Sequence, residues 1–96
     1  MNLIAVDIGN TNIKVGLFLK GEEKGVESVP GQDEQKLTGV LKAAWEQIPL
    51  VKNSKEKKHD GVIVVSSVNP IWTALVAIRN SYLLLLDILG LIIYIP

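Results

Sequence analysis

The stretch VDIGNTNIKVGLF, Val6–Phe18, constrains the fold more than any other part of the sequence. An apolar run, Leu3–Val6, leads into Asp7, and the chain crosses Gly9–Asn12 before an alternation of apolar and polar residues begins at Ile13. Short apolar runs rich in Ile and Val are typical of strands covered on both faces, and a period of two is typical of a half-buried strand. Because the link is so short, the sequence predicts an antiparallel hairpin whose first strand is central in its sheet.

The remaining segments predict a small mixed α/β sheet. Lys24–Val29 is polar, which suits an edge strand that follows the strand Ile13–Leu19. Apolar residues recur at three- and four-residue spacing over Asp33–Ile48, and this pattern predicts an amphipathic helix with an acidic start. The other expected elements are a doubly covered strand at Val62–Val65, a helix from Ile71 into the high eighties, and a strand at Leu91–Ile95. The resulting order, β-β-β-α-β-α-β, indicates crossover helices on the faces of a mixed sheet.

Size and charge narrow the class of protein. With 96 residues the chain supports one small domain with a single core. Ten Lys plus Arg balance ten Asp plus Glu, so no net charge points to nucleic acid or to an anionic membrane as a partner. The absence of cysteine excludes disulfides and thiolate metal sites, and it suits a reducing cytosol. The amino terminus lacks the basic lead and the small-residue cleavage site of a signal peptide.

The apolar segment Tyr82–Pro96 invites comparison with a membrane span. It is shorter than the roughly twenty residues that a span needs, and Asp87 and Gly90 interrupt it. We therefore expect a buried helix and strand.

The single histidine, His59, lies in the basic loop Asn53–Asp60, and we expect the histidine and its loop to be solvated. Trp45 lies on the apolar stripe of the expected helix, and we expect it in the core.

Two interpretations of the Gly9–Asn12 turn are open. In the first, Gly and Asn serve only the turn, because both tolerate positive φ. In the second, successive backbone N–H groups converge on an anion, Asp7 is held at the end of a buried strand, and Lys14 adds positive charge. A carboxylate beside phosphate needs a divalent cation between them, and magnesium held largely through water meets this need. The second interpretation predicts a site for the phosphates of a nucleotide.

The hairpin string DIGNTNIKVGLF resembles the phosphate-binding hairpin of type III pantothenate kinases, which belong to the superfamily of actin, sugar kinases and heat-shock chaperone ATPases. SSVNP, Ser66–Pro70, is similar to an S-S-V-x-P element that follows the fourth strand in that family. The resemblance implies a ribonuclease-H-like α/β fold. It also implies that residues 1–96 are an incomplete first domain of a two-domain kinase, an amino-terminal nucleotide-phosphate-binding portion without its second domain.

The resemblance also implies roles for individual residues. Asp7 would organise magnesium through water, and Ser66 and Ser67 are expected to line the cleft, although a helix-start role for them is an equal alternative. The implied reaction transfers the ATP γ-phosphoryl group to pantothenate, the first step of coenzyme A synthesis, in a cytoplasmic homodimer. A monovalent cation, potassium or ammonium, would bind outside this chain. The implied ATP phosphate contacts are Asp7, Ile8, Gly9, Asn10, Thr11, Asn12, Ile13 and Lys14.

No catalytic residue is expected within the chain itself. The family's catalytic Asp belongs to a G-x-D-R element, and no such string occurs here. We therefore expect no turnover by the chain alone. One hypothesis for its apolar tail is a truncation or a changed reading frame near Asn80. Two alternatives remain open: another small-molecule kinase of the superfamily, such as a sugar kinase, or a non-catalytic nucleotide-binding or regulatory protein. An enzyme needs a second acidic residue to take the acceptor proton, and a binding module does not.

Overall fold

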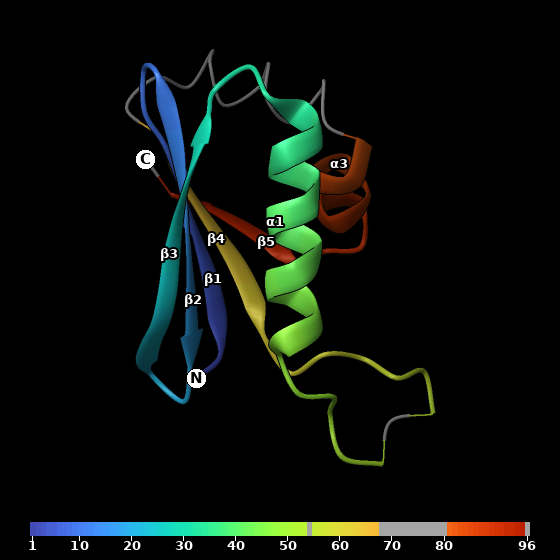
Figure 1. The fold of residues 1–96 in the computed structure, drawn as a ribbon. Helices are drawn as coiled ribbons and strands as arrows, with labels where there is room; N and C mark the ends of the chain where they lie inside the picture. Colours follow the sequence, from blue (N-terminus) through green and yellow to red (C-terminus); the bar gives the residue numbers. More distant parts are fainter. Residues whose placement is uncertain (54, 68–80, 96) are drawn as a thin grey trace.

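A five-stranded mixed sheet with helices packed on it forms the protein, as the computed structural model shows for residues 1–53, 55–67 and 81–95 (Figure 1). The strand order is β3-β2-β1-β4-β5, so β1 is central, as predicted. Residues 68–80, which include the start of the expected helix from Ile71, lie outside the described residues. The elements are β1 (Leu3–Ile8), β2 (Asn12–Leu19), β3 (Glu22–Pro30), α1 (Glu34–Gln47), β4 (Val62–Ser67), α3 (Ser81–Ile88) and β5 (Ile92–Ile95).

The strand directions confirm the expected mixed sheet. β1 is antiparallel to β2 and parallel to β4, β2 is antiparallel to β3, and β4 is parallel to β5. The carboxyl ends of β1 and β4 therefore meet at one end of the sheet, beside the β1–β2 hairpin. In open sheets this end is where ligands usually bind.

The core lies between one face of the sheet and α1. Alternate residues of β1, β2 and β4 are buried on that face, and the apolar stripe of α1 packs over them. Asp33 caps α1, because its Oδ1 accepts a hydrogen bond from the Lys36 backbone N–H at 3.0 Å. The buried residues are Ile4, Val6, Ile8, Ile13, Val15, Leu17, Val29, Leu37, Leu41, Ala44, Trp45, Ile48, Ile63, Val65 and Leu86.

Helix α3 lies on the same side of the sheet as α1 (Figure 1). The two helices meet where the Lys42 Nζ atom lies 5.3 Å from the centre of the Tyr82 ring. Partial burial, and then the negative charge of Glu46, raises the pKa of the Tyr82 phenol above its ordinary value. Within the described residues no helix is long and apolar enough to cross a membrane.

Coverage of the sheet is less complete than the apolar runs indicated. We expected β1 and β4 to be covered on both faces, but Ala5 and Val64 on the second face are only half-buried, and Asp7 is exposed. We also expected the tail to be buried, and here too the prediction holds only in part. Leu86 of α3 is in the core, whereas much of β5 is exposed, because this strand forms an edge of the sheet. Edge strands lack a neighbour on one side, so composition alone overestimates their burial.

The expectation of a solvated His59 is wrong. Its ring is half-buried, and Nδ1 donates a hydrogen bond of 2.6 Å to the Ile48 carbonyl at the end of α1. The ring centre lies 5.2 Å from that of Trp45, which is buried as predicted. His59 thus holds the returning end of the α1–β4 loop against the helix, while Lys52 and Lys57 in the rest of the loop are exposed, as expected.

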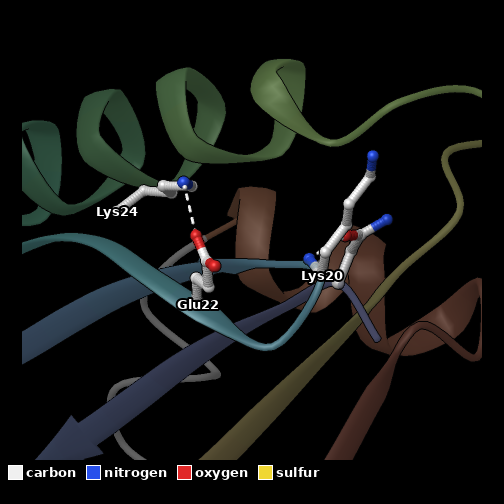
Figure 2. Close-up of polar contacts among 4 residues, drawn as sticks. Lys20, Glu22 and Lys24 are labelled. Carbon is white, nitrogen blue, oxygen red and sulfur yellow. Dashed lines mark hydrogen bonds and ion pairs between the residues drawn. The ribbon is translucent and has the colours of Figure 1, made fainter.

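Asn2, which precedes β1, contacts the segments after β2 and before β4, at the end of the sheet away from the tip of the β1–β2 hairpin. Its side-chain oxygen accepts from the Lys20 backbone N–H at 2.8 Å, and its side-chain nitrogen donates to the Asp60 carbonyl at 3.0 Å. Figure 2 shows Lys20 beside the Glu22–Lys24 ion pair, whose atoms are 3.1 Å apart. The Asn2 side chain thus links the turn after β2 to the residue Asp60 ahead of β4.

Candidate functional site

The β1–β2 hairpin turns tightly and exposes its tip. The Gly9 N–H donates to the Asn12 carbonyl at 3.0 Å, which closes the turn and commits the Gly9 amide to the hairpin itself. Asn10 and Thr11 form the exposed tip. Among the described residues, neither of their amides donates to another backbone group, whereas the Thr11 carbonyl accepts from the Gly31 N–H at 2.9 Å. The residue that follows β3 therefore supports the tip, and the two tip amides have no backbone acceptor among the described residues.

Positive φ does not explain the residues of this turn. The described residues with φ in the left-handed region are Lys20, Gly21, Asn53, Lys57 and Gly90, and none belongs to the hairpin tip. Glycine suits position 9 for a steric reason instead, because a Cβ atom there would lie 3.1 Å from the Asn12 carbonyl oxygen. The turn-only interpretation based on positive φ therefore fails for Gly9 and Asn10, although Gly9 still serves the hairpin.

Strand register places the polar residues of the sheet end in one row. Asp7 pairs with Lys14 on β2 and with Ser66 on β4, and Lys14 pairs in turn with Ser28 on β3. All four side chains share the face opposite to the α1 core, because side chains alternate along a strand and each of the four has a buried core residue next to it: Val29, Ile13, Ile8 and Val65. The row thus presents a hydroxyl, an ammonium, a carboxylate and a second hydroxyl on four neighbouring strands.

Other expected contact residues do not reach this row. The side chains of Ile8 and Ile13 are fully buried on the core face, so only their backbone can contribute to a site at the hairpin. Ser67 pairs with Ile8 and shares its side of the sheet. The structure therefore separates the two serines of the SSVNP element, and only Ser66 lies beside Asp7. The sequence indicated that the two side chains point to opposite faces of a strand. Which serine shares the face of Asp7 follows only from the register between β1 and β4.

The charges of the row are available to a ligand. Asp7 and Lys14 are cross-strand neighbours and both are exposed, yet they form no ion pair with each other. In the described part of the chain, ion pairs join Glu22 to Lys24 and Glu56 to Lys58. Exposed ion pairs contribute little to stability, and Asp7 and Lys14 belong to neither of these two pairs.

The residues of the site fit magnesium in one particular form. No group of three or more His, Cys, Asp or Glu residues that could enclose a metal occurs among the described residues. Asp7 is the one carboxylate in the row, and Mg²⁺ is commonly held by one or two carboxylates together with water and substrate phosphates. Asp7 therefore fits a magnesium ion that arrives with an anionic ligand, and does not fit a preformed metal cage.

Three hollows lined by described residues lie away from the tip of the hairpin. A groove of about 390 Å³ runs between α1 and β2–β3, with Gly25, Gly39 and Ala43 among its lining residues. Two hollows of about 380 and 590 Å³ lie at the end of the sheet where Asn2 is found. None of the three includes Asp7, the turn or Lys14, so the candidate site is an exposed surface rather than one of these hollows.

Comparisons with known proteins concern the chain as a whole and do not assign roles to its single residues. A family model described as type III pantothenate kinase matches residues 3–89. A search of solved structures finds a chain of the Aquifex aeolicus PPX-GPPA enzyme, with 15% sequence identity and a TM-score of 0.38. That match covers 98% of the present chain but 36% of the solved one, so the present chain spans about a third of its length. No curated protein matches the sequence.

Proposed function

The chain belongs to the type III pantothenate kinase family, and from this premise we propose that it provides the ATP-phosphate site of a pantothenate kinase. The reaction transfers the γ-phosphoryl group of ATP to the hydroxyl group of pantothenate, at the start of coenzyme A synthesis. Membership of the family indicates a kinase, and residues 1–96 correspond in this proposal to an incomplete first domain whose partner domain supplies the acceptor site.

The observation that carries the proposal is the joint exposure of the hairpin tip and the Asp7 row. The amides of Asn10 and Thr11 are donors without backbone partners, and Lys14 is a cation without an ion-pair partner, within the described residues. Backbone amides and a lysine are the groups that hold phosphates in many nucleotide sites. Asp7 beside them is acceptable to a polyphosphate once magnesium lies between the two.

Each residue then has a role in binding rather than in bond making. Asp7 orders the water around magnesium, the tip amides donate to phosphate oxygens, and Lys14 neutralises developing charge. Bound magnesium supplies charge neutralisation on the transferred phosphoryl group. Ile8 and Ile13 anchor the hairpin in the core. Because the hairpin is already held in place, binding of the nucleotide costs little conformational entropy at the tip.

The acceptor side of the proposal belongs to the rest of the kinase. Asp7 is the one carboxylate in the row, and a residue that organises magnesium is not free to take the acceptor proton. A second domain is therefore proposed to supply the base, the pantothenate site and the site for potassium or ammonium. The proposed assembly is a cytosolic homodimer, as in the family.

A domain fusion tests whether the chain provides a working ATP-phosphate site. Joined to the second domain of a type III pantothenate kinase, the chain is expected to support transfer of labelled phosphate from ATP to pantothenate, whereas the chain alone gives none because one domain cannot position both substrates. Glucose serves as the control acceptor and is expected to remain unlabelled. Nucleotide binding with no transfer to either acceptor would favour a regulatory module.

A further inference from the structure

The two adjacent serines of β4 differ in what they can contact. Ser66 pairs with Asp7 and Ser67 pairs with Ile8, so successive side chains point to opposite faces of the sheet. Ser66 is half-buried on the face that carries Asp7 and Lys14. Ser67 already has an interaction partner of its own. Only Ser66 is therefore placed to contact a ligand bound over the row.

The row also gives the ligand a direction. Lys14, Asp7 and Ser66 lie on β2, β1 and β4, three neighbouring strands about 4.8 Å apart. The hairpin tip joins β1 to β2, so the tip amides and Lys14 lie on one side of Asp7, and Ser66 lies on the other. An anion held by the tip, by Lys14 and by magnesium at Asp7 must extend across β1 to reach the Ser66 hydroxyl.

We propose that Ser66 determines the length of polyphosphate that the site prefers, by donating a hydrogen bond to the terminal phosphate of a nucleoside triphosphate. The inference rests on the proposed function and adds to it the discrimination of triphosphate from diphosphate. A diphosphate that occupies the tip and the Asp7 position ends before Ser66, whereas a triphosphate has one more phosphate group to place there. The hydroxyl fits this role because it donates to an anion without adding charge.

Paired titrations test this inference. The chain is titrated with a nonhydrolysable ATP analogue and, separately, with ADP, both in excess Mg²⁺. Ser66→Ala is expected to weaken binding of the triphosphate about tenfold, the usual effect of losing a hydrogen bond to a charged group, and to leave ADP affinity unchanged. Ser66→Thr keeps the hydroxyl and is expected to restore the preference. Ser28→Ala is the matched control, because Ser28 is in the same row but beyond Lys14.

The outcomes separate this inference from the function on which it rests. If the unmodified chain binds neither nucleotide, the proposed phosphate site and the role of Ser66 both fail. If it binds both and Ser66→Ala weakens the two ligands equally, or leaves both unchanged, the role of Ser66 fails while the phosphate site stands. A loss confined to the triphosphate, with recovery in Ser66→Thr, is the result that the register predicts.

Discussion

Replacing Asp7 with asparagine is expected to weaken binding of a nonhydrolysable ATP analogue in Mg²⁺ by about 10- to 100-fold, the range expected when a charge-assisted contact is lost. The same change is expected to remove most of the difference between titrations with and without Mg²⁺. The reason is that Asp7 is the one carboxylate of the row, so magnesium loses its anionic anchor on the protein. Isothermal titration calorimetry measures both quantities.

The stability of the variant separates ligand binding from folding. Asp7 is exposed and has no ion-pair partner among the described residues, so Asp7→Asn should leave the thermal unfolding midpoint within about 2 °C of the original. Asp60→Asn is the control for the chemical change, because Asp60 lies at the far end of the sheet, where its carbonyl contacts Asn2. If the Asp7→Asn variant kept the same Mg²⁺-dependent affinity for the nucleotide, the proposed role of Asp7 in holding magnesium would be wrong.

Replacing Gly61 with valine is expected to lower the free energy of unfolding by about 3 kcal/mol, near the upper end of the usual cost of overpacking. A Cβ atom at Gly61 would lie 2.9 Å from Cδ1 of Ile48 and 3.0 Å from the Asn2 carbonyl oxygen. Ile48 is fully buried and Asn2 is held by hydrogen bonds to Lys20 and Asp60, so neither neighbour can move away cheaply. Urea denaturation followed by far-UV circular dichroism measures the loss.

The same substitution at an open position is the control for Gly61→Val. Gly25 lies on edge strand β3, and no atom lies within 4 Å of the position that its Cβ would take. Valine also suits a strand better than glycine. Gly25→Val is therefore expected to change the unfolding free energy by less than about 1 kcal/mol. Equal destabilisation by the two variants would show that the crowding around Gly61 is relieved by movement of its neighbours.

The sequence predicted the hairpin, the central strand and the helix stripe because each depends on local periodicity. Leu3–Val6 and the alternation after Ile13 fixed the first two strands, and the observed strands extend those boundaries by one or two residues. The helix expected over Asp33–Ile48 is α1, with Asp33 as its cap and Ile48 at its end.

What the sequence did not predict depends on contacts between distant residues. The burial of His59 follows from packing against Trp45, fourteen positions earlier, and no pattern within its loop indicates it. The assignment of Ser66 to the Asp7 row follows from parallel register between β1 and β4. The hydrogen bond from the Gly9 amide to the Asn12 carbonyl is a detail of turn geometry. Because of this bond, the tip has fewer backbone N–H groups for phosphate than the sequence led us to expect.

The central claim is that the tip of the β1–β2 hairpin binds phosphate through its backbone amides. The most direct measurement is the chemical shift of each backbone amide by NMR as Mg²⁺ and a nonhydrolysable ATP analogue are added together. We expect large, saturable changes in chemical shift at the amides of Asn10 and Thr11, and small changes at the amide of Gly21, in the turn at the opposite end of the sheet. Shifts at Asn10 and Thr11 no larger than those at Gly21 would contradict the claim.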